Sequence, residues 1–176
     1  MKPLLRPNLP SGEYKLIFKA VYKCDLMNIN ETIQLNIHLS QKSSYGTEYV
    51  GNVTLLEPLN DDLDVNVNMA VMDKIGGWKP NAYVYSSNKA CSTVKRFYGR
   101  TFHTFLGIEH AECPVAKGVY NVRYDTKNFE NTFKPAVFFY GKYRFKQFYT
   151  NKQNTVVGCN IAAVDVVRPW DTEGNY

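Results

Sequence analysis

Residues 63–71 read LDVNVNMAV, and this stretch decides the fold class. Apolar and polar side chains alternate along it. This period of two is typical of a β-strand with one buried face and one solvent-exposed face. The apolar set is Leu63, Val65, Val67, Met69 and Val71. We expect this set to form one wall of an apolar interior, with Tyr143 and Phe145 on the wall opposite.

The same period of two recurs along most of the chain. It predicts further strands over residues 14–22, 33–39, 49–56, 82–85, 118–124, 133–139, 143–149 and 156–167. Residues 87–106 instead carry apolar side chains at three- and four-residue spacings, which predicts the one substantial helix, although Gly99 lies inside it. Many short strands with turn signals between them predict a mostly β protein. We expect two antiparallel sheets in a sandwich or cup with an apolar cavity.

Length and composition indicate one globular domain. The chain has 176 residues, of which 44% are apolar and 21% charged, so intrinsic disorder is excluded. We expect an N-terminal lead over 1–13, a single domain over 14–167 and a C-terminal tail over 168–176. No apolar run reaches the roughly 20 residues of a bilayer span, which predicts a soluble protein.

Cysteines and sequons indicate an oxidising compartment. Cys24, Cys91, Cys113 and Cys159 contain no C-x-x-C pair, so two disulfides are predicted, with three connectivities open. Asn30 and Asn52 each begin an Asn-x-Thr sequon and are candidate glycosylation sites. We expect a secreted protein, or one of the lysosomal lumen. The start of the sequence lacks the apolar run of a signal peptide, so we take it to be a mature or re-started form.

The sequence offers little for catalysis. It has no G-x-S-x-G elbow, and we interpret His38, His103 and His110 as ordinary surface or capping histidines. His110, Glu112 and Cys113 lack the further ligands that a closed zinc site needs. We therefore expect no catalytic residues, no metal and no cofactor. A hydrolase that depends on His103 or His110 is the third alternative.

Charge predicts the kinds of partner. The formal net charge of +5 is spread along the chain, which favours transient contact with an anionic membrane surface. In residues 142–148 basic and aromatic side chains alternate, so a strand would place cations and rings on opposite faces. A nucleic-acid surface needs both on one exposed face, so we expect no nucleic-acid partner.

The run Val137-Phe138-Phe139-Tyr140 breaks strict alternation. It fits a strand that is buried on both faces. It fits equally an apolar rim at the mouth of a ligand cavity, or a segment that dips into a membrane.

Several short motifs occur together and in order along the chain. They are Gly51-Asn52-Val53-Thr54-Leu55, Cys113-Pro114, Lys117-Gly118-Val119-Tyr120, Pro135, Gly141-Lys142-Tyr143-Arg144 and Gly158-Cys159-Asn160-Ile161-Ala162-Ala163. With them, the chain resembles the ganglioside activator proteins of the ML lipid-recognition superfamily and their insect chemosensory relatives of the CheB kind. The likeness covers roughly residues 14–167.

The resemblance implies a β-cup whose cavity takes lipid acyl chains. It also implies that Cys24 pairs with Cys159 and Cys91 with Cys113. It further implies a mobile loop at the cavity mouth, carried here by Val137, Phe138 and Phe139. The ganglioside activators have further disulfides that this chain lacks, so the resemblance does not extend to a ganglioside substrate or a hydrolase partner.

Taken together, the residues and the resemblance predict a secreted, non-enzymatic protein that binds or transfers a lipid or another hydrophobic small molecule. The alternative is a protein-interaction module, such as a secreted effector or receptor ligand. Such a module would keep the same sandwich but fill its cavity with rings.

Overall fold

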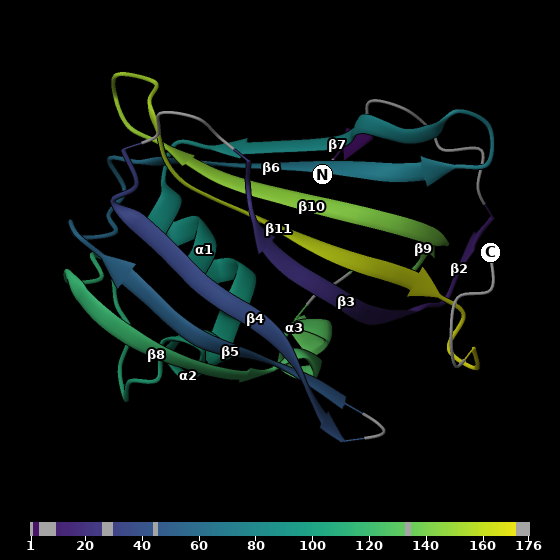
Figure 1. The fold of residues 1–176 in the computed structure, drawn as a ribbon, viewed down its shortest axis with the longest axis horizontal. Helices are drawn as coiled ribbons and strands as arrows, with labels where there is room; N and C mark the ends of the chain where they lie inside the picture. The colour runs from purple at the N-terminus through teal and green to yellow at the C-terminus, as the bar shows by residue number, and fades with distance from the viewer. Residues whose placement is uncertain (1, 4–9, 26–29, 44–45, 133–134, 172–176) are drawn as a thin grey trace.

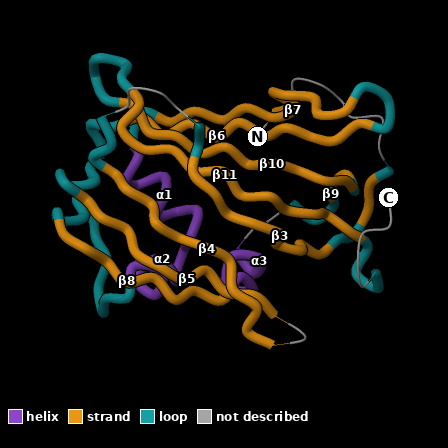
Figure 2. The backbone as a smooth tube through the Cα atoms, viewed as in Figure 1, coloured by secondary structure: helices purple, strands orange, loops and turns teal. Residues whose placement is uncertain are grey.

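The computed structural model describes residues 2–3, 10–25, 30–43, 46–132 and 135–171. Within these ranges the chain is mostly strand, and every pairing between neighbouring strands is antiparallel (Figures 1 and 2). The prediction of a mostly β, antiparallel fold is confirmed, and a short two-stranded sheet accompanies the two larger sheets.

The large sheet has six strands in the order β1-β7-β6-β10-β11-β3. Their bounds are β1 Lys2–Pro3, β3 Lys15–Lys23, β6 Asp64–Asp73, β7 Gly77–Ser87, β10 Gly141–Thr150 and β11 Val156–Val167. Consecutive elements β6 and β7 form a hairpin, whereas β3 and β11, from opposite ends of the chain, lie side by side. The first and last long strands therefore close the same sheet.

The small sheet has three strands in the order β4-β5-β8, namely β4 Ile33–Ser43, β5 Gly46–Leu55 and β8 Gly118–Asp125. A two-stranded pair, β2 Ser11–Gly12 with β9 Phe138–Phe139, lies at the far end of the large sheet (Figure 1). Part of the expected N-terminal lead thus forms β1 and β2.

The two sheets meet where β4 crosses β11. The Thr32 N–H donates to the Val157 carbonyl over 3.0 Å, and Ile33 packs directly on Gly158. A Cβ atom on residue 158 would lie 2.8 Å from the Cβ of Ile33, so only glycine permits this approach. The sheets diverge from this junction.

Helices also connect the two sheets. Helix α1 Ala90–Tyr98 contacts β6 of the large sheet, and α2 Phe102–Leu106 contacts β8 of the small sheet. A single 3₁₀ turn, η1 Gly99–Thr101, joins them. The predicted helix therefore exists but is interrupted, because Gly99 ends α1 with a φ of 55°, which is outside the α-helical region.

In residues 126–139 the structure has one element that was not predicted, and one predicted strand is mostly wrong. Residues Thr126–Thr132 form helix α3, which begins where the Asp125 side chain accepts the Lys127 N–H over 2.9 Å. Residues 135–137 are not in a strand, and of the predicted strand 133–139 only Phe138–Phe139 pairs, as β9. Residues 133–134 lie outside the described chain.

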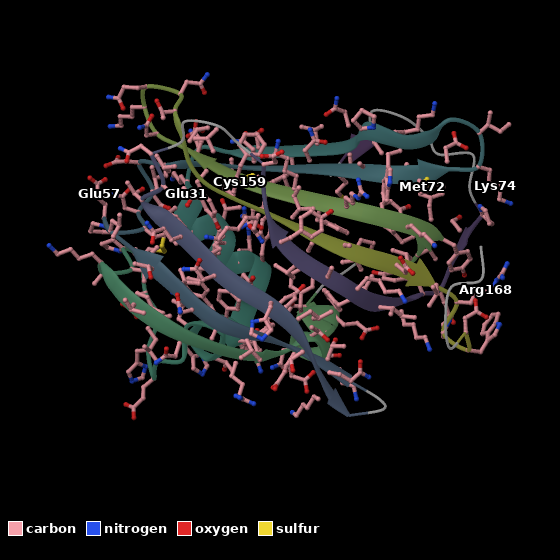
Figure 3. The ribbon with its side chains drawn as sticks, in the orientation of Figure 1. Glu31, Glu57, Met72, Lys74, Cys159 and Arg168 are labelled. Atoms are coloured by element: carbon pink, nitrogen blue, oxygen red, sulfur yellow. A yellow bond between two sulfur atoms is a disulfide. The ribbon has the colours of Figure 1, made fainter. Side chains whose placement is uncertain are left out.

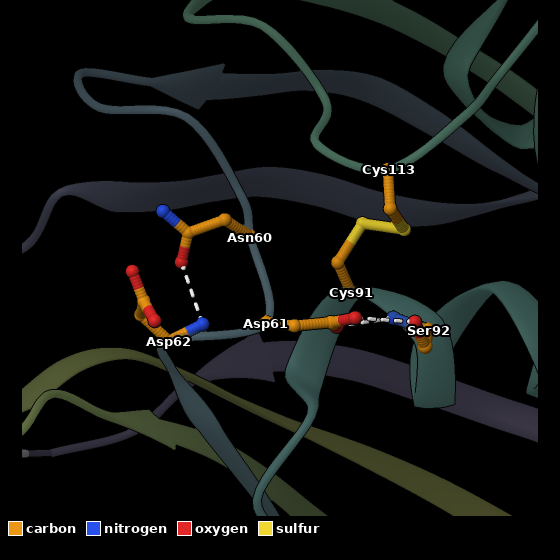
Figure 4. The surroundings of a disulfide bond; sticks show 6 residues. All are labelled: Asn60, Asp61, Asp62, Cys91, Ser92 and Cys113. Atoms are coloured by element: carbon orange, nitrogen blue, oxygen red, sulfur yellow. Dashed lines mark hydrogen bonds between the residues drawn. A yellow bond between two sulfur atoms is a disulfide. The ribbon is translucent and has the colours of Figure 1, made fainter.

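The N-terminus of α1 is capped by a loop far away in sequence. Lys89, at the cap position, makes no side-chain cap bond, and the Asp61 carboxylate instead accepts the Ser92 N–H over 2.8 Å (Figure 4). It also accepts the Ser92 hydroxyl, and these bonds from Ser92 lower the pKa of Asp61. A carboxylate here also interacts favourably with the helix dipole.

Replacing Asp61 by alanine is expected to lower the free energy of unfolding by about 1 kcal/mol at pH 7, the usual value of a cap. Because the folded-state pKa of Asp61 is lowered, this stabilisation is present above the unfolded pKa and is lost as the pH falls through the folded one. Urea unfolding of both proteins at pH 7 and pH 2 measures it. An unchanged difference at the two pH values would contradict the role of the charge.

Candidate functional site

The inner face of the large sheet is built by the stretch that decides the fold. Val65, Val67, Met69 and Val71 are buried on one face of β6, and Asp64, Asn66, Asn68 and Ala70 lie on the other. Leu63, just before the strand, is half-buried against the same core. The predicted set therefore lies together, facing the interior between the sheets.

Tyr143 and Phe145 lie beside this set rather than across from it. Strand β10 pairs with β6, and Tyr143 is opposite Val71 and Phe145 opposite Met69 in the register. Side chains directly opposite in an antiparallel pair point to the same face. The expectation of two facing walls is wrong on this point. From the other sheet, β4 contacts β3 and β11, and its Leu35, Ile37 and Leu39 pack against the core.

Apolar side chains at the centre of the inner face of the large sheet are not fully buried. Phe145 lies mid-strand on β10, with β6 on one side and β11 on the other, yet its side chain is only half-buried. Its neighbour on β11, Ala162, and the next residue across, Val21 on β3, are half-buried too. Apolar surface thus stays accessible at positions that a fully interlocked sandwich would cover.

Polar side chains also lie on this inner face. Gln147 of β10 is opposite Val67 on one side and Asn160 of β11 on the other. The Gln147 Nε2 donates to the Tyr149 hydroxyl over 2.6 Å. Burial raises the pKa of Tyr149 to about 12, so its phenol is neutral. The sequence analysis did not identify Gln147, Tyr149 or Asn160 as site residues, although each occupies an inward position of its strand.

The helices fill part of the space between the sheets with aromatic rings. Tyr98 of α1 stacks on Phe105 of α2 with ring centroids 4.4 Å apart, and Tyr124 of β8 packs edge-on against both. Phe18 of β3 and Phe129 of α3 extend the cluster to the large sheet. Burial raises the pKa of Tyr98 well above its ordinary value. The rings bind the two sheets and the helices together.

A second aromatic group lies at the far end of the large sheet, where Figure 3 shows Lys74 and Arg168. The Phe138 ring contacts Tyr14, Tyr83 and Tyr143, with centroid distances of 5.5 to 6.0 Å. Phe139 is also half-buried, whereas Val137 is 58% exposed. Of the three predicted rim residues, two pack against the core and Val137 faces solvent.

Both disulfides have the predicted pairing. Cys24 is bonded to Cys159, which ties β11 to the residue after β3, and Cys91 of α1 is bonded to Cys113 (Figures 3 and 4). The pairings implied by the family resemblance are thus confirmed.

The outer face of the large sheet is basic. Lys142 and Arg144 are exposed on it, and the Arg144 guanidinium lies 3.9 Å from the centroid of the Trp78 ring. Tyr143 and Phe145 point inward, which confirms the predicted separation of cations from those rings. Phe148 is an exception, because it lies on the outer face with Lys146 5.6 Å away.

One pocket, of about 220 Å³, lies on the surface beside the helices. Both His103 and His110 line it, together with Lys95, Gly99, Arg100, Phe102, Glu109, Ala111 and Glu112. None of these nine residues is a serine, threonine or cysteine. Among the described residues, no three His, Cys, Asp or Glu side chains gather closely enough to hold a metal ion. His38 is exposed on β4, apart from this pocket.

The sequons differ in setting. Asn30 is exposed just before β4. Asn52 is half-buried on β5, the central strand of the small sheet, and its Oδ1 accepts the Asn36 side-chain amide over 3.3 Å. Asn30 is therefore the more accessible acceptor for a glycan.

No helix in the described ranges combines the length and the apolar character needed to cross a bilayer.

Comparison with known proteins gives no match to any family model and none to a curated protein sequence. Among solved structures, the chain is similar to chicken MD-1 in its complex with lipid IVa, at 13% identity and a TM-score of 0.36. That alignment covers 90% of this chain and 98% of the other. A likeness this distant assigns no function, which has to be argued from the site.

Proposed function

We propose that the protein is a secreted, non-enzymatic carrier that binds a lipid or another hydrophobic small molecule between its two sheets, in the manner of the ML lipid-recognition superfamily. The bound molecule would lie over the inner faces of β10 and β11, opposite β4. Val65, Val67, Met69 and Val71 would form the buried surface beside it, with Leu63, Tyr143 and Phe145 on the same face of the sheet.

The half-buried side chain of Phe145 carries this proposal. A phenylalanine at the centre of the inner face of a six-stranded sheet has both strand neighbours in place, so only the facing layer can leave it uncovered. Ala162 and Val21 beside it are half-buried as well. So are Leu35, Ile37 and Leu39 of β4, the strand of the other sheet that contacts β3 and β11. An apolar guest would cover all of these at once.

The energy available is sufficient for binding without catalysis. Each buried methylene contributes about 0.8 kcal/mol, so ten would contribute about 8 kcal/mol before the costs of association. The described interior supplies aliphatic and aromatic side chains with a few neutral polar groups, a composition typical of a binding cavity.

Two disulfides support an extracellular or lysosomal location, because cytosolic thiols are kept reduced. The basic outer face of the large sheet supports transient contact with an anionic membrane during lipid exchange. The exposed Val137 supports the rim function proposed for Val137, Phe138 and Phe139.

The ring cluster around Tyr98 favours a second candidate, a protein-interaction module with a filled interior. The cluster occupies the space between the sheets on the helical side and already stabilises the fold without a guest. In this alternative, a receptor or another protein would be the partner.

Native mass spectrometry of the intact, disulfide-bonded protein separates the two candidates. After gentle purification, a retained lipid mass, or uptake of the neutral dye N-phenyl-1-naphthylamine with a rise in fluorescence, is expected of a carrier. A protein that is always empty and takes up no dye would reject the carrier in favour of the module.

A further inference from the structure

Two buried polar atoms have no hydrogen-bond partner within the described part of the chain, namely the Asn160 Oδ1 and the Tyr83 hydroxyl. Leaving such a group unpaired is destabilising, so each one requires a physical reason. Tyr83 lies in the aromatic group around Phe138, 5.5 Å from that ring. Asn160 lies elsewhere, at the place proposed for the bound molecule.

The register fixes where the Asn160 side chain is. Asn160 is opposite Gln147, and one pair along the same strands Ala162 is opposite Phe145. Both pairs therefore face the interior, with the amide next to the half-buried apolar surface. Gln147 uses its Nε2 on the Tyr149 hydroxyl rather than on Asn160. A polar corner made of Asn160, Gln147 and Tyr149 thus borders the apolar surface that carries the proposed function.

The charges around this corner favour a neutral ligand group. The cations of β10, namely Lys142, Arg144 and Lys146, point to the opposite face of the sheet. Lys23 of β3 is opposite Asn160 in the register and is exposed, so it is the one described cation beside this amide in the strand pairing. An ionised carboxylate or a phosphate diester would offer the Asn160 oxygen no hydrogen-bond donor, and a cationic donor would be repelled by Lys23. An amide oxygen instead accepts a hydrogen bond from a hydroxyl or an N–H group.

We propose that Asn160, with Gln147 and Tyr149 beside it, is a subsite that accepts a hydrogen bond from a neutral hydroxyl or amide N–H group of a long-chain ligand. This inference rests on the proposed function and narrows its ligand class. The preferred guests are hydrocarbon chains that bear a neutral donor, ahead of hydrocarbons, ethers and simple esters of the same size.

The test compares two isomers, 1-dodecanol and methyl undecyl ether, as competitors of N-phenyl-1-naphthylamine bound to the full chain. They have equal numbers of atoms, but only the alcohol donates a hydrogen bond. The wild-type protein is expected to bind the alcohol about 5- to 10-fold more tightly, the effect of one buried hydrogen bond. In Asn160→Leu the preference is expected to fall to about one, with the affinity for the ether kept.

Asn36→Leu is the matched control, because Asn36 is an exposed asparagine on β4 whose amide already has a partner in Asn52. It is expected to keep the preference for the alcohol. Equal affinity of the wild type for both isomers, or a preference that survives in Asn160→Leu, would overturn the subsite while the carrier function stands. If the wild type binds neither the dye nor the isomers, both proposals fail.

Thermal melting without ligand provides an independent readout. Since the Asn160 Oδ1 has no partner among the described residues, Asn160→Leu is expected to melt at or above the temperature of the wild type. A melting temperature lowered by several degrees would show that the fold itself satisfies this amide, and would overturn the subsite. If Asn160→Leu does not fold, Asn160→Ala, which also removes the amide oxygen, replaces it in the competition assay, with the same loss of preference expected.

Discussion

Replacing Cys24 and Cys159 together by serine is expected to lower the free energy of unfolding by about 5 kcal/mol. The disulfide joins residues 135 apart in the sequence, so its loss frees a large part of the unfolded chain. It also links β11 to the segment after β3, next to the junction of the two sheets at Gly158. Urea unfolding followed by circular dichroism measures the difference.

The second disulfide provides the comparison. Cys91 and Cys113 are 22 residues apart, and the same relation gives about 3.4 kcal/mol for their joint replacement by serine. We expect the Cys24/Cys159 variant to be the less stable of the two. The reverse order would show that packing around Cys91, which is fully buried, outweighs the length of the closed loop.

Replacing Ala162 by tryptophan is expected to reduce the affinity for the dye and for lipid by at least about 100-fold, which corresponds to roughly 2.7 kcal/mol of binding free energy. Ala162 lies between Phe145 and Val21 on the inner face and is half-buried, so a tryptophan there would occupy the space proposed for the guest. Titration of Ala162→Trp with N-phenyl-1-naphthylamine, beside the wild type, gives the change.

The neighbouring alanine is the control. Ala163 is opposite Arg144 and therefore lies on the outer face, so Ala163→Trp is expected to leave affinity within about twofold of the wild type. If Ala162→Trp binds the dye as well as the wild type, the guest does not lie over this part of the sheet. If it unfolds while Ala163→Trp folds, the interior is solid, and the carrier proposal fails.

The strands could be predicted from the sequence because a sheet with one buried face requires apolar side chains at every second residue. Strand β11 occupies the predicted residues 156–167, and the apolar face of β6 is the predicted one. Helix α3 could not be predicted in this way. It has seven residues, and Phe129 is its only large apolar side chain, too few to show a helical period.

Contacts between distant segments could not be read from periodicity. The pattern shows that Tyr143 and Phe145 point inward, but strand order decides whether they flank β6 or face it. The cap on α1 comes from Asp61, 31 residues before Ser92, where no local signal marks it. Asn160 is similar, because its position within the alternation shows that it is inward-facing but not that its amide lacks a partner.

The sequence by itself determined the mostly β class, the inward and outward faces of the strands, the need for two disulfides and, through family resemblance, how the cysteines pair. These follow from local chemistry, because alternation and residue type act within a few positions of the chain. The tertiary structure alone decided which strands are neighbours, where Phe145 stays uncovered and which buried amide oxygen lacks a partner in the described part of the chain. These depend on long-range packing, in which the closing of one sheet by strands from both ends of the chain sets what each inward side chain meets.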